Sequence, residues 1–242
     1  MFRSSVCAAV IMVGFAAPSS SATMKVEFSG SVSKSTDQSG IFGQGSGSAL
    51  DGLAYTLTYI YDTAVGTRTA LNGKNDQLKG GTAYGAANPT TSAVLTINGQ
   101  SQSVMGSFGS SYYIEDDSFN LLDQFALVAQ DSTVGNDGSF KGGYLQAIFA
   151  SFSEFIPTNL ESSFFANIPA GEIGSFSFKD YDGVSNAFKT FTEGDLSLDQ
   201  VTVTRTDVAA VPLPASGLML LAGLGGIALL GSLRKKRSAS LL

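Results

Sequence analysis

The sequence contains no histidine, no tryptophan and a single cysteine, Cys7. Without histidine the chain cannot build an imidazole triad, a histidine-ligated zinc site or a histidine general base. Cys7 lies in a segment that we expect to be removed, so the mature protein is expected to have no disulfide and no thiol chemistry. The absence of tryptophan makes a sugar-stacking surface less expected, although eight tyrosines remain.

Basic residues are scarce between the two ends of the chain. All 20 acidic residues lie between Glu27 and Asp207, whereas Arg3 and the basic cluster at 234–237 lie outside that interval. The net charge of the whole chain is −6, and the part between these basic ends is therefore more acidic still. Nucleic-acid binding needs a positive surface that neutralises phosphates, so this distribution argues against it.

The sequence also lacks the short motifs of common enzymes. It has no G-x-S-x-G nucleophile motif and no P-loop, and the glycines at 43–47 lack the strand–helix context of a dinucleotide site. A glycoside hydrolase needs two carboxylates that face each other across a cleft, whereas the acidic pairs here are adjacent or one residue apart in expected turns. We therefore predict no catalytic residue and no enzyme, with a hydrolase as the weakest alternative.

Residues 1–22 have the pattern of an export signal. Arg3 supplies a positive start, residues 6–17 form an apolar run that is too short to span a bilayer, and Ser20-Ser21-Ala22 precedes an expected cleavage before Thr23. The exported domain is then expected to comprise residues 23–208.

The C-terminal part is predicted to be a membrane anchor. Residues 213–233 contain no charged side chain, and about 20 apolar residues suffice for a transmembrane helix. Pro212 and Pro214 lie where the first turn of a helix tolerates proline. The cluster Arg234-Lys235-Lys236-Arg237 follows at once and predicts a cytoplasmic C-terminus. A plain single-span anchor explains this pattern without any sorting function.

A more specific interpretation comes from the order of the three parts. The proline motif Val211-Pro212-Leu213-Pro214-Ala215, the apolar span and the basic cluster together resemble the PEP-CTERM class of bacterial sorting signals, in its VPLPA variant, over about residues 209–237. The short tail 238–242 is longer than is usual in that class. The resemblance implies processing by an exosortase-type protease in a Gram-negative bacterium. The domain would be periplasmic while anchored in the inner membrane, and then at the cell surface or extracellular.

Between the two ends, apolar residues recur with the period of two that is typical of half-buried strands. This pattern predicts an all-β fold, a two-sheet antiparallel sandwich of the jelly-roll kind. Asn98-Gly99 predicts a two-residue type I′ hairpin turn, residues 66–90 a surface loop, and residues 159–167 either a short helix or an irregular loop. The expected strands are 24–32, 53–61, 93–97, 100–105, 110–114, 124–129, 144–152, 173–178 and 196–204.

Acidic turns and tyrosines are the remaining candidates for binding. The acidic groups are Glu115-Asp116-Asp117, Asp131 with Asn136 and Asp137, and Asp180 with Asp182. Carboxylates in turns supply the oxygen ligands of calcium, and the loop from Asp131 to Asp137 is the best of these candidates, although none has EF-hand spacing. Ordinary turns use the same residues.

The leading prediction is a non-enzymatic surface or extracellular-matrix protein without a cofactor, with structural calcium as an open hypothesis. The alternative is a carbohydrate-binding module that uses Tyr112, Tyr113 or Tyr144 as stacking surfaces. Exopolysaccharide is a candidate partner in either case.

Overall fold

The computed structural model of the 242-residue chain describes residues 22–71, 73–118, 122–151, 157–168 and 173–206. The chain divides into two compact units between Thr206 and Asp207, and only the first contains described residues. The expected export signal, apart from Ala22, and the expected sorting tail lie outside them. Within the described residues, no helix has the length and apolar character needed to cross a membrane.

The described residues form strands and one short 3₁₀ turn, η1 (Thr82–Tyr84). The strands are β1 (Thr23–Asp37), β2 (Ala54–Asp62), β3 (Thr67–Leu71), β4 (Asn75–Gly80), β5 (Thr90–Ile97), β6 (Gln100–Val104), β7 (Gly109–Ser118), β8 (Leu122–Val134), β9 (Phe140–Ser151), β10 (Phe164–Asn167), β11 (Ile173–Asp182) and β12 (Ala187–Arg205).

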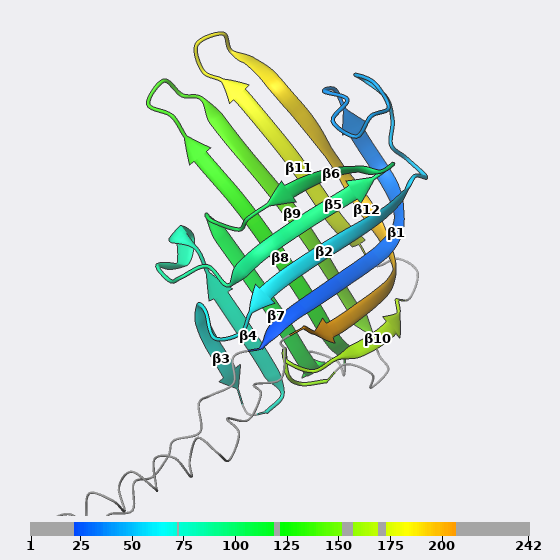
Figure 1. Cartoon of the computed structure of the whole chain (residues 1–242), viewed down its shortest axis with the longest axis vertical. Helices are drawn as coiled ribbons and strands as arrows, with labels where there is room; N and C mark the ends of the chain where they lie inside the picture. The colour runs from blue at the N-terminus through cyan, green and yellow to red at the C-terminus, as the bar shows by residue number, and fades with distance from the viewer. Residues whose placement is uncertain (1–21, 72, 119–121, 152–156, 169–172, 207–242) are drawn as a thin grey trace, which may run out of the picture. The chain divides into compact units, whose positions relative to one another are not determined.

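All of these strands belong to one antiparallel sheet with the order β3-β4-β7-β8-β9-β11-β12-β1-β2-β5-β6, and β10 pairs with β12 beside this path. The sheet curls, so that a front layer of β1, β2, β5 and β6 crosses over a back layer of β7, β8, β9 and β11 (Figure 1). The prediction of an all-β antiparallel domain is confirmed. Its division into two separate sheets is not, because β1 and β12 pair along nearly their whole length and join the layers.

The curl depends on a close approach of these two long strands. Their pairing register shifts between Ser29 and Gly30. A Cβ atom at Gly30 would lie 1.9 Å from the carbonyl oxygen of Ser197, which no other residue type could accommodate without moving the backbone. Glycine therefore lets β1 and β12 stay in contact where the sheet turns from one layer to the other.

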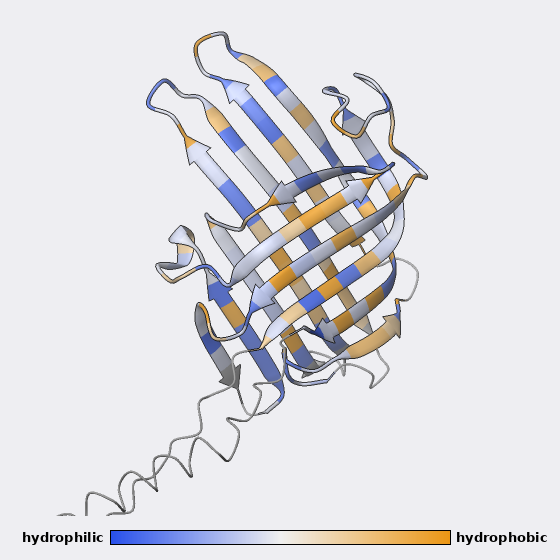
Figure 2. Ribbon diagram, viewed as in Figure 1, coloured by the Kyte–Doolittle hydropathy of each residue, from blue (hydrophilic) through white to orange (hydrophobic). Residues whose placement is uncertain are grey.

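The core lies between the layers and is rich in aromatic rings. Phe28 of β1 lies 6.2 Å from Phe125 of β8 and 6.4 Å from Phe149 of β9, measured between ring centroids. Tyr61 of β2 stacks on Tyr112 of β7 at 4.0 Å. Along the front strands, apolar and polar residues alternate, as Figure 2 shows. The period of two in the sequence is thus the alternation between core and solvent.

Several local predictions are confirmed. Asn98 and Gly99 both have positive φ, 51° and 73°, as a type I′ turn requires, and they connect β5 and β6. The expected strand 144–152 corresponds to β9, which is inside the sheet because it pairs with both β8 and β11.

Two loop predictions are wrong. Residues 66–90 contain β3, β4 and η1, and the segment 159–167 contains β10 in place of a helix or an irregular loop. These strands are short, β3 and β4 are largely polar, and pairing with distant partners stabilises all three, so a local pattern does not reveal them. Arg68 illustrates this, because it bonds both carboxylate oxygens of the buried Asp76 at 2.9 and 2.6 Å and also pairs with Glu161.

The glycine-rich loop after β1 is held by a buried carboxylate. Asp37 is 1% exposed and accepts hydrogen bonds from Gly40 N at 2.8 Å, Phe42 N at 3.4 Å and the Thr192 hydroxyl at 2.6 Å. The loop inserts Phe42 into the core, where its ring lies 5.8 Å from that of Phe176. The loop therefore closes one end of the space between the layers.

Candidate ligand-binding cleft

The inner face of the back layer changes chemistry where the front layer ends. On β8, the inward residues Phe125, Leu127 and Ala129 are buried, and the next two inward positions are Asp131 and Thr133. The front layer ends at β6, and the back strands continue past it (Figure 1). The polar continuation of this face therefore borders an open cleft.

The strand register arranges the cleft residues in two rows across the back layer. The first row pairs Asp131 with Gly143 and Gly143 with Phe178. The second row runs from Thr133 to Lys141, Asp180 and Thr190 on β8, β9, β11 and β12 in turn. Directly opposed residues of an antiparallel pair have Cβ atoms about 4.5–5.5 Å apart. Hydroxyl, ammonium and carboxylate groups are thus neighbours on one surface.

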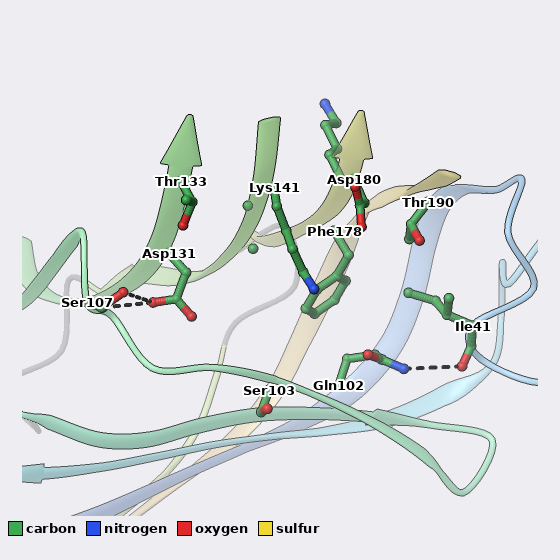
Figure 3. Close-up of a pocket in the computed structure, with 13 residues that line it drawn as sticks. Ile41, Gln102, Ser103, Ser107, Asp131, Thr133, Lys141, Phe178, Asp180 and Thr190 are labelled. Carbon is green, nitrogen blue, oxygen red and sulfur yellow. Dashed lines mark hydrogen bonds between the residues drawn. The ribbon is translucent and has the colours of Figure 1, made fainter. Parts of the chain in front are cut away.

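The cleft has a volume of about 530 Å³. Its opposite wall comes from β6 and the loops around it, with Gln102, Ser103, Ser107 and Ile41. Figure 3 shows Lys141 reaching from β9 into the space between the two walls, beside the ring of Phe178. Volumes of about 300–1,000 Å³ are usual for small-ligand sites, so the cleft is large enough for an organic ligand.

Asp131 fixes the loop that follows β6. Its carboxylate accepts a hydrogen bond from Met105 N at 2.7 Å. It also accepts bonds from Ser107 N at 2.8 Å and from the Ser107 hydroxyl at 2.7 Å (Figure 3). On the other wall, Gln102 Nε2 donates to the Ile41 carbonyl at 3.5 Å. These contacts tie β6 to the back layer at one end of the cleft and to the Gly40–Gly47 loop at the other. The walls are therefore held in place without a ligand.

Lys141 and Asp180 are the charged groups that these contacts leave available. They are opposite each other in the β9–β11 register, yet neither forms an ion pair with any residue that the structure describes. The carboxylate of Asp131, by contrast, is already hydrogen-bonded to the loop after β6. A ligand in the cleft would therefore meet one free ammonium and one free carboxylate, with hydroxyl and amide groups around them.

The acidic groups singled out in the sequence are not brought together as a calcium site. Asp137 accepts bonds from Ser139 N at 3.0 Å and the Ser139 hydroxyl at 2.6 Å, and these bonds, the hydroxyl first, lower its pKa. Asp131 points instead at the loop after β6. Among the described residues there is no group of three or more acidic side chains placed to hold a metal ion. The structure therefore does not support the hypothesis of a calcium loop from Asp131 to Asp137.

The other two acidic groups also serve local structure. Asp182 accepts bonds from the backbone of Val184 and Ser185 at 2.9 and 3.2 Å, in the turn between β11 and β12. Glu115 accepts a hydrogen bond from the Tyr113 hydroxyl. The side chains of Asp116 and Asp117 lie outside the described set.

The predicted tyrosine surface is wrong for Tyr112. This side chain is fully buried, donates or accepts a bond with the Thr90 hydroxyl at 2.6 Å and has a pKa raised by burial. Tyr113 is half-buried on the outer face, and burial followed by the neighbouring Glu115 raises its pKa to about 12. Tyr144 is half-buried too and lines a hollow of about 320 Å³ on the outer face.

Sequence reasoning missed most of the cleft. Lys141, Gln102 and Thr190 were not expected to act together, because they come from β9, β6 and β12. One signal was present on β8, where the apolar period of two continues with polar residues at positions 131 and 133. Such a change on one face marks the point where a strand leaves the core.

The predicted sorting residues Val211, Pro212, Leu213, Pro214 and Ala215, and the basic residues Arg234, Lys235, Lys236 and Arg237, lie outside the described residues. No protein-family model, curated protein or solved structure matches the chain.

Proposed function

We propose that the chain is an exported cell-surface or extracellular-matrix protein that is sorted through its C-terminal tail. The observation that carries the proposal is the order of three features in residues 209–237. A VPLPA motif is followed directly by an apolar span and then by four basic residues. Each feature is common alone, but this order at a chain terminus resembles a sorting signal. The domain has a structural or interaction role and no catalytic role.

In this proposal the tail holds the domain close to the membrane before processing. Strand β12 ends at Arg205 and the motif begins at Val211, so only a short segment separates them. The domain would be periplasmic while the apolar span remains in the inner membrane, because the basic cluster stays in the cytoplasm. An exosortase-type protease would then cut near the motif. We also infer that the two layers of the curled sheet correspond to the two sheets of a sandwich of the jelly-roll kind.

Mass spectrometry of the mature C-terminus, in a Gram-negative host that has an exosortase, tests the proposal. A C-terminus near Ala215 is expected. Replacing both Pro212 and Pro214 by alanine should leave the chain uncut, whereas deleting residues 238–242 is the matched control and should leave cutting intact. A mature protein that still ends at Leu242 in the unaltered chain would instead indicate a plain membrane anchor. An unchanged final location after deletion of residues 209–242 would exclude a sorting role.

A carbohydrate-binding module is the second candidate function. The cleft between β6 and the back layer favours it, because the cleft presents converging polar side chains on a rigid sheet.

A further inference from the structure

We propose that the cleft between β6 and the back layer binds a short segment of a neutral polysaccharide. This inference deepens the interaction role that is proposed above and gives it a site and a ligand class. It differs from the site suggested by the sequence, because the tyrosines lie in the core or on the outer face.

The cleft walls match the hydrogen-bonding needs of a sugar. Each sugar hydroxyl both donates and accepts, so a saccharide is best recognised where donors and acceptors alternate. The second row offers a hydroxyl at Thr133, an ammonium at Lys141, a carboxylate at Asp180 and a hydroxyl at Thr190 in consecutive positions. The amide of Gln102, which shares the inner face of β6 with the buried Val104, faces them from the opposite wall.

The charge of the cleft favours a neutral ligand. The free ammonium of Lys141 and the free carboxylate of Asp180 balance each other. A phosphate or nucleotide would have to approach Asp131 and Asp180 with only Lys141 free to neutralise it, because the other lysine of the lining, Lys179, pairs with Glu193 at 2.7 Å. Such an approach is unfavourable in a partly desolvated site. Charged side chains give the strongest hydrogen bonds to neutral partners, so both can bind sugar hydroxyls.

A peptide added as a further strand beside β6 fits this geometry less well. Strand β6 spans only Gln100–Val104, and Asp131 draws the following loop against the back layer at Met105 and Ser107. An added strand depends on a row of main-chain hydrogen bonds along a free edge. The free edge of β6 is short and is closed at this end, so few such bonds are possible.

Pre-organisation supports binding of a flexible chain. The loop after β6 and the loop after β1 are both tied by hydrogen bonds, so the walls lose little freedom when a ligand enters. At the inner end of the cleft, where it meets the core, Val104 packs directly on β9. This contact requires glycine at position 143, because a Cβ there would clash with Val104 Cγ2 at 2.8 Å. The inner end of the cleft is therefore formed by close contact between β6 and β9, while its outer side is open to a longer chain.

Isothermal titration of the purified full-length protein in detergent tests the proposal. The probes are neutral tetrasaccharides of β-1,4-glucose, β-1,3-glucose, α-1,4-glucose and α-1,6-mannose. At least one should bind, and Lys141→Met and Asp180→Asn should each weaken it by about tenfold or more, since a hydrogen bond to a charged group is lost. Tyr144→Ala is the matched control on the outer face and should bind as the unaltered protein does. Thermal unfolding of each variant checks that the fold is intact.

Three outcomes would overturn the proposal. The first is that none of the four tetrasaccharides binds. The second is that Tyr144→Ala removes binding while Lys141→Met and Asp180→Asn do not, which would place the sugar in the outer hollow. The third is that an extended Ser/Thr-rich heptapeptide binds more tightly than every tetrasaccharide. None of these results concerns processing of the tail, which the mass of the mature C-terminus reports separately.

Discussion

The two halves of the back layer share the same strands but have different inner faces. In the covered half, Phe125 of β8 and Phe149 of β9 are buried against Phe28 of the front layer, and Phe176 of β11 is buried against Phe42 of the loop after β1. In the uncovered half, the same three strands present Asp131, Lys141 and Asp180 to the cleft. The pairing register continues without a shift from one half to the other on β8–β9 and through this region of β9–β11. Only the cover by β1, β2, β5 and β6 changes.

This difference shows how one sheet can separate stability from recognition. A buried large apolar side chain contributes about 1.5–3 kcal/mol relative to an exposed one, so the covered half supplies most of the stability. A buried lysine or aspartate without a partner would cost several kcal/mol, so the polar half cannot be covered by an apolar layer. Exposed positions of the uncovered half, such as Thr133 and Lys141, can therefore vary in sequence for binding with little effect on folding, whereas Asp131 still holds the loop after β6.

The largest effect should come from matched substitutions on β8. Phe125→Ala removes a ring within 6.2 Å of Phe28, 5.7 Å of Phe149 and 5.5 Å of Phe164. The cavity should lower the free energy of unfolding by about 3–5 kcal/mol. Thr133→Ala, on the same strand and face but exposed, should change it by less than about 0.5 kcal/mol. Guanidinium denaturation measures both. Similar losses for the two variants would show that the front layer does not define two halves.

The loop after β1, which packs Phe42 against Phe176 at one end of the covered half, should depend on Asp37 for its stability. Asp37→Ala leaves the partly buried Gly40 N and the buried Thr192 hydroxyl without their acceptor and releases the loop that inserts Phe42. We expect a loss of about 2–4 kcal/mol in the free energy of unfolding. Asp51→Ala is the matched control, since this exposed carboxylate accepts a bond from the Ser35 hydroxyl and should matter by less than about 0.5 kcal/mol. Equal effects in urea titrations would contradict the anchoring role.

The covered half could largely be predicted from the sequence, because burial of one strand face imposes the period of two. The run Leu53–Tyr61 predicts β2 and its core face, and Asn98-Gly99 predicts the hairpin of β5 and β6. Long strands with a strong pattern carry this information locally. The single continuous sheet was not predictable in the same way, since the alternation of side chains is the same in one curled sheet and in two separate sheets.

The uncovered half and the sheet edges could not be predicted, because their residues depend on distant partners. Strand β4 has a composition typical of a loop, yet its Asp76 is buried, because Arg68 pairs with the carboxylate. Tyr112 and Tyr113 are adjacent, so one of them must face the core. Tyr112 shares its face with the buried Ile114, which is a signal that the sequence interpretation did not use. The cleft itself forms because the front layer ends at β6, whereas the back strands continue past it.

Two tyrosines of β2 give a smaller and more specific test inside the covered half. Tyr61 and Tyr59 are both fully buried on the same face. The Tyr61 hydroxyl donates to the Leu160 carbonyl at 2.9 Å, whereas the Tyr59 hydroxyl has no hydrogen-bond partner among the described residues. Tyr61→Phe should therefore lower the free energy of unfolding by about 1 kcal/mol, and Tyr59→Phe should leave it unchanged or raise it by up to about 1 kcal/mol. Thermal denaturation measures both changes, and destabilisation by Tyr59→Phe would indicate an unseen partner.

The smallest effect is expected at the far end of the uncovered half, in the turn that holds Asp182. Backbone N–H groups of Ser185 and Val184, and then Lys189 at 3.2 Å, lower the pKa of this carboxyl below its usual value of about 3.9. A carboxyl with a lowered pKa in the folded state stabilises the protein above its unfolded pKa, and the contribution is lost as the pH falls through the folded pKa. Asp182→Asn keeps an acceptor for the turn but removes the charge, so its small destabilisation at pH 7 should disappear as the pH falls through the lowered pKa of Asp182. Carboxyl NMR titration and denaturation at several pH values test this. A normal titration midpoint, or a difference that grows in acid, would show that the turn does not stabilise the ionised form.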